Sequence, residues 1–214
     1  GVFFSLANRI LKGGGEIAAP VFDKDINLKH ILIKDLNDLM KGLGSKYVQS
    51  DMSQIYSEIK RRLDKNVKIL FSGTPCQVFG LKKFLSYDYD NLICIDLICH
   101  GVPSVKFWNK YKFYLENEFG SSINKVEFRN KEYGWPDFCI KISFENGNVY
   151  KVHHDLEPYF LMFRDNYILK DSCYNCVCKG DKSLSDITIG DAWGTEKYKD
   201  QQQKGLSYVI CNTK

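Results

Sequence analysis

The sequence lacks any feature that would place the chain in or across a membrane. Its most apolar run, residues 92–98, is too short to cross a bilayer and is interrupted by Asp96. No secretory signal follows Gly1, because a helical pattern begins at once. Disulfide frameworks are typical of small secreted domains, whereas 214 residues are enough to bury a core. We therefore expect a cytoplasmic chain whose 8 cysteines stay reduced.

An excess of charge of one sign is also missing. The 30 basic and 26 acidic residues leave a net charge of +4, which is too small and too dispersed to indicate a nucleic-acid partner. The sequence shows no internal repeat, low-complexity tract or clear linker. It therefore predicts a single domain over residues 1–214, which we expect to be truncated at both ends.

The hydrophobic pattern predicts a mixed α/β fold. A short apolar strand at 67–71, a helix at 74–85 and a buried strand at 92–98 form a βαβ unit within a central mixed sheet with flanking helices. Strict alternation over 138–144, followed by Asn146-Gly147, predicts an antiparallel hairpin. Further elements are predicted as helices at 3–11, 51–63, 104–120 and 156–163, and as strands at 17–22, 31–33, 187–189 and 206–210.

The first candidate site lies at the strand-to-helix turn of the βαβ unit. Gly73 ends the strand, Thr74 and Gln77 form a capping-box pattern, and Pro75 takes the favoured first helical position. Cys76 follows at the second position, where unpaired amides and the helix dipole stabilise a thiolate. A metal ligand or reactive thiol would gain from this placement, and a small buried residue under the helix is an equal alternative.

A second cysteine follows the next strand. Cys99 and His100 stand where α/β proteins commonly place their chemistry, beyond the end of a buried strand. Cys99 would reach the Cys76 turn if the two strands are neighbours. His100 is a candidate proton donor or flavin neighbour, although a lone histidine is more often structural.

Cys173 and Cys176 form a CxxC pair that can grip one ion or one edge of a cluster. The second CxxC pair of a zinc ribbon is absent, and the pair does not open a helix after a strand as in thioredoxin-like dithiols. Cys178 lies just beyond the pair, and we interpret it as a bystander in preference to a spare ligand.

The remaining cysteines fall within predicted strands. Cys94 and Cys211 are expected to fill core, and Cys139 lies on the polar side of its strand. None of the three is assigned as a ligand. Four thiols from three segments then suit a [4Fe-4S] cluster or an all-thiolate zinc site: Cys76, Cys99, Cys173 and Cys176.

No Walker loop or Rossmann fingerprint is present, yet one small loop could hold a phosphate. Gly44, Ser45, Lys46 and Tyr47 offer backbone amides, a hydroxyl group and a positive charge. A plain turn with an exposed lysine explains the same residues.

Two cations stand near an aromatic residue further along the chain. Arg129 and Lys131 precede Trp135 and could bind an anionic group or stack on a ring, whereas the simpler interpretation is a solvated charge pair at a strand end. Asp191 falls in phase with apolar Ile187 and Ile189, so its carboxylate needs a partner. We interpret Asp191 as an anchor for the cysteine loop in preference to a site residue.

In these motifs the chain resembles the coenzyme F420 hydrogenase/dehydrogenase beta-subunit family. The residues around Cys99 are similar to those of its bacterial branch, whose members often accompany polysaccharide-synthesis enzymes. The stretches that carry the resemblance cover nearly the whole chain, in order: 44–50, 70–77, 96–104, 128–135, 173–176, 186–194, 204–207 and 212–213.

The resemblance implies an iron–sulfur flavoprotein oxidoreductase that passes electrons between a flavin, FAD or FMN, and a [4Fe-4S] cluster. It implies Cys76, Cys99, Cys173 and Cys176 as cluster ligands, and the loops 44–47 and 73–77, with His100, as flavin neighbours. The implied partners are a small hydride carrier, such as coenzyme F420, and a redox protein or ferredoxin-like domain. A segment of that kind precedes the corresponding region in many relatives. Two alternatives remain: a non-enzymatic interaction module stabilised by a four-cysteine zinc site, and a disulfide reductase that uses the CxxC pair.

Overall fold

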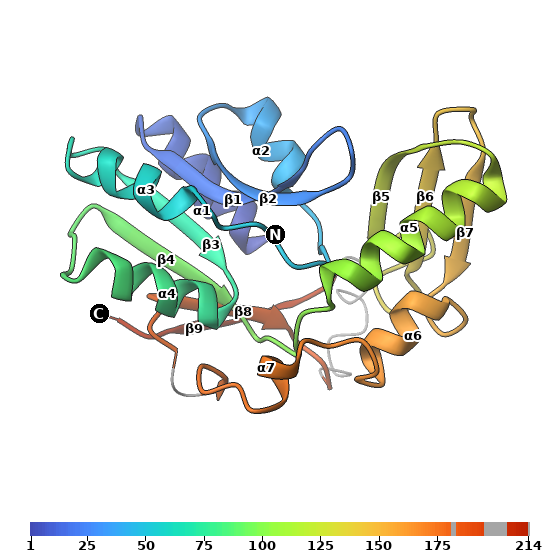
Figure 1. Cartoon of the computed structure of the whole chain (residues 1–214). Coiled ribbons are helices and arrows are strands. Elements are labelled where there is room, and N and C mark those ends of the chain that lie inside the picture. The colour runs from blue at the N-terminus through green and yellow to red at the C-terminus, as the bar shows by residue number, and fades with distance from the viewer. Residues whose placement is uncertain (181–182, 195–204, 214) are drawn as a thin grey trace.

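A computed structural model describes residues 1–180, 183–194 and 205–213 (Figure 1). Lys204, which belongs to one of the resembling stretches, lies outside them. The helices are α1 (Val2–Lys12), α2 (Leu36–Gly42), α3 (Ile55–Leu63), α4 (Pro75–Leu85), α5 (Val105–Phe119), α6 (Pro158–Arg164) and α7 (Asp171–Tyr174). The strands are β1 (Glu16–Phe22), β2 (Leu28–Ile33), β3 (Ile69–Gly73), β4 (Leu92–Leu97), β5 (Ile123–Asn130), β6 (Cys139–Phe144), β7 (Val149–His153), β8 (Ile187–Asp191) and β9 (Ser207–Cys211).

A six-stranded mixed sheet forms the larger part of the fold. Its strand order is β2-β1-β3-β4-β8-β9. The four inner strands run parallel, and β2 and β9 close the two edges in antiparallel pairing. The predicted βαβ unit is confirmed as β3-α4-β4, with Gly73 level with Asp96 across the parallel pair. The turns that follow β3 and β4 therefore open at the same edge of the sheet.

Helices cover both faces of this sheet, as expected when strands are apolar on both sides. α3 and α4 pack with Ile69, Phe71 and Cys94 on one face. On the other face, α1 and α2 contribute Ala7 and Leu39 to a cluster with alternate strand residues such as Leu70 and Ile95. Residues that follow each other in β3 thus fill opposite cores, which holds the strand ends in place from both sides.

The predicted hairpin is confirmed as β6 and β7, and it belongs to a three-stranded antiparallel sheet with β5. Gly147 supplies the positive φ of 87° that the tight turn requires. α5 and α6 pack on this sheet beside the larger one (Figure 1). The core here is strongly aromatic, and Trp108, Phe128 and Tyr159 are each at most 1% exposed. We call this part, residues 105–164, the inserted module.

Two short chain segments join the inserted module to the large sheet. Pro103 pairs with Leu169 in an antiparallel bridge. The Ser104 amide donates to the Ile168 carbonyl at 3.0 Å, and the Lys170 amide donates to the Val102 carbonyl at 3.0 Å. Residues 102–104 and 168–170 therefore run side by side as a stem, so the chain leaves the large sheet and returns to it at one place.

Several sequence predictions need correction. The helix predicted at 51–63 begins only at Ile55, because Asp51 instead bonds β2 through the backbone of Leu28 and His30. α2 and β5 were not predicted. Cys139 is buried, and Cys211 is exposed because β9 is an edge strand that shows every residue to solvent. Among the helices of the described residues, none combines the length and hydropathy of a bilayer-spanning segment.

Candidate functional site

The Cys76 turn is shaped by the capping box that the sequence predicts. The Gln77 side chain accepts from the Thr74 amide at 2.8 Å, and the Thr74 side chain accepts from the Gln77 amide. Cys76 is exposed, and its sulfur lies 3.2 Å from the Thr74 hydroxyl. A Cβ on Gly73 would stand 2.9 Å from both Gln77 Oε1 and the Phe71 ring. A larger residue than glycine at position 73 would therefore disturb the end of β3, the capping box and the position of Cys76.

Cys99 lies in the neighbouring turn, as the sequence predicts if the two strands pair. It follows β4, which pairs with β3. A side chain at Gly101 would stand 2.7 Å from Leu169, so this turn also needs glycine in order to lie against the stem. His100 is exposed and sets its ring edge-on to Phe163 at 5.1 Å.

The stem brings the CxxC segment to the same edge of the sheet. It leads directly into α7, where the Cys173 amide donates to the Lys170 carbonyl at 2.8 Å. Lys179 then ties this segment to the Cys99 turn, because its ammonium donates to the His100 carbonyl at 2.6 Å and to the Cys173 carbonyl at 3.2 Å. Segments more than 70 residues apart along the chain thus lie against each other.

The four predicted ligand thiols interact electrostatically. Burial, together with negative charge on Cys76, Cys173 and Cys176, raises the pKa of the Cys99 thiol to about 11, although Lys179 opposes the shift. The Cys99 thiol therefore resists ionisation until a cation stands beside it. The structure therefore brings all four of these residues into one neighbourhood, and their role as ligands stays a prediction.

Cys178 belongs to the same neighbourhood, although the sequence favoured a bystander role. It is 7% exposed, and burial, followed by repulsion from Cys176 and Cys76, raises the pKa of its thiol. The signal in the sequence was the C-x-C spacing to Cys176. No three sulfurs of these five described cysteines lie within 4.8 Å of one another. Zinc–sulfur bonds of about 2.3 Å would separate tetrahedral thiolates by only about 3.8 Å, so this arrangement is wider than a single zinc ion needs.

The loop of Gly44, Ser45, Lys46 and Tyr47 lies beyond the end of α2. Gly44 has a positive φ of 84°. The Lys46 ammonium turns inward and donates to the carbonyls of Gly42, Leu43 and Gly44 at 2.8, 2.9 and 3.1 Å. Burial lowers the pKa of Lys46 to about 8. Lys46 therefore fixes the shape of the loop here, and phosphate binding by the loop stays a prediction.

His30 connects Ser50 to the end of β3, next to the Cys76 turn, and it was not among the residues singled out from the sequence. Its Nδ1 lies 2.7 Å from the Ser50 hydroxyl and its Nε2 lies 2.9 Å from the Ser72 carbonyl. The ring is 7% exposed and stacks on Phe71. Burial lowers the pKa of His30 to about 4, which keeps the imidazole neutral at pH 7. The one signal was a histidine in an otherwise apolar strand.

Arg129 is the least satisfied charge among the described residues. Its side chain is 9% exposed and pairs with Asp191, so Asp191 anchors the arginine. The Nε and Nη2 atoms are buried, and neither has a hydrogen-bond partner among the residues that the structure describes. The guanidinium lies 4.6 Å from the centre of the Phe138 ring and 5.9 Å from those of Trp135 and Trp193. Two orphaned donors in a buried guanidinium are the expected signature of a missing anionic or polar partner.

Tyr47 connects the arginine to the sulfur neighbourhood. Burial raises the pKa of its phenol, and the Arg129 charge lowers it, which places the two groups within electrostatic range. The Tyr47 ring contacts Phe163 at 4.8 Å, and Phe163 in turn contacts His100. Lys131 lies near as well, since burial and then the Arg129 charge lower its pKa. The predicted flavin-side and sulfur-side residues therefore adjoin one another.

Comparison with known proteins identifies the family of the chain. A search of curated proteins finds no match. Among solved structures, the fold is similar to a chain of the F420-reducing [NiFe] hydrogenase complex from Methanosarcina barkeri, with a TM-score of 0.56 and 17% sequence identity over 87% of this chain. The present chain spans 62% of the length of that one. Residues 66–214 match the family described as the C terminus of the coenzyme F420 hydrogenase/dehydrogenase beta subunit, and the chain belongs to that family.

Proposed function

We propose that the chain is an iron–sulfur flavoprotein module of an oxidoreductase, which passes electrons between a flavin and a [4Fe-4S] cluster. One observation carries the proposal: three separate segments bring Cys76, Cys99, Cys173 and Cys176 into a single electrostatic neighbourhood. Family membership supports a redox role. Four cysteines are the usual ligand number of a [4Fe-4S] cluster, and no three of the described sulfurs are as close together as a single zinc ion would require.

The sulfur side is held by backbone contacts rather than by the thiols themselves. The capping box fixes Cys76, the β4 turn fixes Cys99, and Lys179 joins that turn to the CxxC segment. The Lys179 ammonium also lowers the energy of negative charge on Cys99. Ligands that are positioned before loading reduce the ordering cost of binding. Cys178 provides a fifth sulfur close by, as a reserve ligand.

The flavin side consists of the loop 44–47, the turn 73–77 and the surroundings of Arg129. The orphaned Nε and Nη2 of Arg129 would donate to an anionic group, either a phosphate of FAD or FMN or a carboxylate of the hydride carrier. Lys131 adds a second positive charge beside it. The Trp135 and Trp193 rings, stacked at 4.3 Å, supply an aromatic surface beside the guanidinium.

His100 stands between the two sides. Its ring rests on Phe163, which also carries Tyr47, so the imidazole is oriented while its polar edge remains accessible. A flavin, when bound, supplies hydride exchange, and a cluster supplies transfer of single electrons. The part of the protein is to hold both groups close, to keep a proton available at His100 and to shield the charge of the carrier at Arg129.

The hydride carrier and redox partner follow from the same proposal. The similar chain comes from a complex that acts on coenzyme F420. We propose coenzyme F420 or another small hydride carrier as substrate, and a ferredoxin-like domain or redox protein as the electron partner. The exposed Cys76 and His100 leave this edge of the sheet open to both.

The test is a cofactor inventory of anaerobically purified chain, with two matched variants. We expect about four irons and sulfides per chain, a flavin spectrum, and loss of most iron in Cys99→Ser. Cys211→Ser is the control, because Cys211 is exposed on edge strand β9 and lies outside the five-sulfur neighbourhood. Unchanged iron in Cys99→Ser refutes the ligand set.

The other outcomes identify the alternatives. Colourless protein with one zinc ion per chain would indicate the non-enzymatic zinc module. Colourless, metal-free protein that reduces disulfides through Cys173 and Cys176 would indicate the dithiol reductase. Either result overturns the iron–sulfur flavoprotein proposal.

A further inference from the structure

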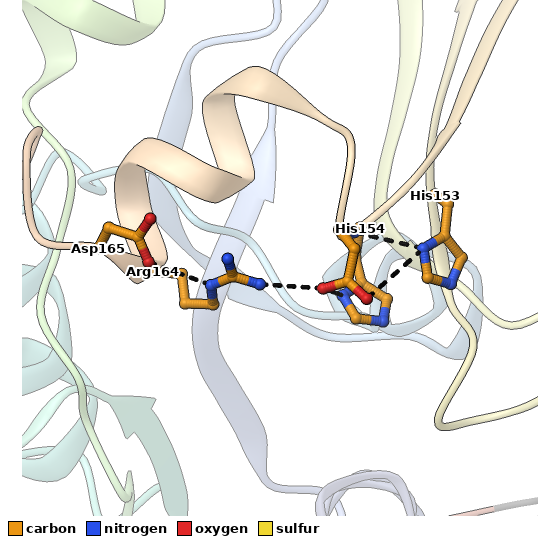
Figure 2. A network of polar contacts seen from close by, with 5 residues as sticks. His153, His154, Arg164 and Asp165 are labelled. Atoms are coloured by element: carbon orange, nitrogen blue, oxygen red, sulfur yellow. Dashed lines mark hydrogen bonds and ion pairs between the residues drawn. The ribbon is translucent and has the colours of Figure 1, made fainter.

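The turn between β7 and α6 carries two neighbouring imidazoles and a carboxylate. His153 ends β7, and His154 and Asp155 follow before Pro158 opens α6. In the described part of the chain, this is the one group of three or more His, Cys, Asp or Glu residues whose ligand atoms all lie within 4.8 Å of one another. Figure 2 shows the two imidazoles side by side, with Arg164 reaching toward them from α6.

The separations fit a single tetrahedral ion. Zinc bonds of about 2.1 Å to nitrogen and oxygen place neighbouring ligand atoms about 3.4 Å apart. Here His154 Nδ1 lies 3.2 Å from Asp155 Oδ1, and His153 Nδ1 lies 3.9 Å from Asp155 Oδ2. These two values lie on either side of the required separation, and because they involve different oxygens of Asp155, the carboxylate must turn for one oxygen to face both imidazoles.

The backbone of the turn orders these side chains in advance. The amides of Leu156 and Glu157 both donate to the His153 carbonyl, at 2.9 and 3.1 Å. The His154 ring stacks on Phe138 at 4.3 Å, and the His154 amide donates to the Phe138 carbonyl at 3.2 Å. The Asp155 amide donates to His153 Nδ1 at 3.3 Å, so this nitrogen is unprotonated, and an ion would take the place of the amide hydrogen at its single lone pair.

The neighbouring cation competes with a metal ion but has an alternative partner. Arg164 Nη1 donates to Asp155 Oδ1 at 2.9 Å, and Arg164 Nε donates to Asp165 Oδ1 at 3.2 Å (Figure 2). Asp165 can retain the guanidinium when the Asp155 carboxylate turns to an ion. The arginine therefore weakens metal binding without preventing it.

The donor set selects the class of metal. Two imidazole nitrogens and one carboxylate oxygen suit zinc and similar borderline ions, whereas magnesium and calcium prefer oxygen ligands. Three protein ligands leave one position for water. We propose that the β7–α6 turn binds one Zn²⁺ through Nδ1 of His153, Nδ1 of His154 and one oxygen of Asp155, and that the ion fixes the conformation of this turn.

The turn lies next to Arg129 but does not depend on the function of that residue. Phe138, on which His154 stacks, also lies under the Arg129 guanidinium. Phe160 of α6 packs edge-on to Phe138 at 5.2 Å. An ion that fixes His154 thereby restrains the Phe138 ring beneath the guanidinium.

The test is a Zn²⁺ titration of the full chain, followed by the imidazole nitrogen signals. The chain has only 4 histidines, so each signal can be assigned by substitution. We expect the Nδ1 signals of His153 and His154 to shift together in one step, separate from any zinc that the cysteines take up, while those of His30 stay in place. This measurement separates the turn from the cysteines, which also bind zinc.

Variants sharpen the test. Asp155→Asn should raise the Kd for Zn²⁺ at least about 10-fold, and Arg164→Gln should lower it several-fold by freeing the carboxylate. Asp38→Asn is the control, because Asp38 is likewise an exposed carboxylate paired with a cation, Lys41, but has no imidazole near it. Equal metal-free unfolding midpoints establish that the variants fold.

The proposal is overturned if the Nδ1 signals of His153 and His154 do not move at about 1 mM Zn²⁺, a concentration at which even weak sites are filled. It is equally overturned if Asp155→Asn binds zinc as tightly as the unmodified chain does.

Discussion

Arg129 and Asp191 form an ion pair whose two members should contribute unequally to stability. The Arg129 side chain is 9% exposed, whereas that of Asp191 is 34% exposed. Removing the carboxylate leaves a buried positive charge, while removing the guanidinium leaves a carboxylate that water can still reach. We therefore expect Asp191→Asn to destabilise the chain more than Arg129→Met, although the arginine makes more contacts.

The magnitudes follow from the contacts of the arginine. Its two buried, unpartnered nitrogens each cost about 1–3 kcal/mol, which methionine would recover. Methionine forfeits the charge-assisted bond, about 1.5–3 kcal/mol, and the stacking on three rings, about 1 kcal/mol each. The gains and losses nearly cancel, so Arg129→Met should change the free energy of unfolding by no more than about 1 kcal/mol. Asp191→Asn should cost about 2–3 kcal/mol, the lower part of the range for breaking a buried pair, because Asp191 is partly solvated.

The assay is urea unfolding of both variants at pH 7, with flavin content measured in parallel. Similar m values would show that the midpoints report stability. Arg129→Met should purify with native stability but with little flavin, because the donors that we assign to the anionic group are gone. If Arg129→Met is the less stable of the two variants, the orphaned donors do not carry the cost assigned to them and the reasoning fails.

Two further predictions concern the Cys76 turn. The pKa of His30 is lowered from 6.5 to about 4, so between these pH values the unfolded chain binds a proton that the folded chain excludes. The free energy of unfolding should therefore be at its full value above pH 6.5 and fall by about 3 kcal/mol as the pH drops to 4. Unfolding at a series of pH values should show this loss, and His30→Gln should remove it; an unchanged pH profile in the variant would assign the effect elsewhere. Gly73→Ala should cost about 1–3 kcal/mol, because its Cβ meets Gln77 and Phe71 at 2.9 Å and disrupts the capping box. Thermal unfolding measures that cost, and a native midpoint together with full iron content would contradict it.

Local patterns predicted much of the fold and half of the site. The βαβ unit followed from two apolar strands around a capped helix, and the meeting of Cys76 and Cys99 followed from pairing of those strands. The hairpin followed from alternation and an Asn-Gly turn. These features depend on neighbouring residues, which sequence periodicity records.

Features that depend on distant contacts were not predictable in this way. β5 pairs with β6 through register shifts that break its alternation, so no strand period stands out. α2 has only 7 residues and is set by a local cap, in which Asp35 accepts from the Asp38 amide at 2.9 Å. Asp191 meets Arg129 from a different sheet, so its partner could not be read from the sequence.

Cys139 shows that the exposure of other residues on the same side of a strand does not always predict the burial of one residue. Lys141 and Ser143, on the same side of β6, are partly exposed, which suggested a polar face, yet Cys139 is buried. The face is covered only at the end of the strand, beside the irregular pairing with Asn130. A two-residue period describes a whole strand and does not record cover at one end.

The stem of residues 102–104 and 168–170 allows the inserted module to change while the cysteine segments on either side of it stay in place. Because its two chain passes are bonded to each other, the distance between Cys99 and Cys173 is set at the stem and not by the 73 intervening positions. Changes in the length of the inserted module that keep the stem paired should therefore leave the spacing of these two cysteine segments unaltered. The inserted module can vary in length during evolution while Cys99 and Cys173 keep their separation.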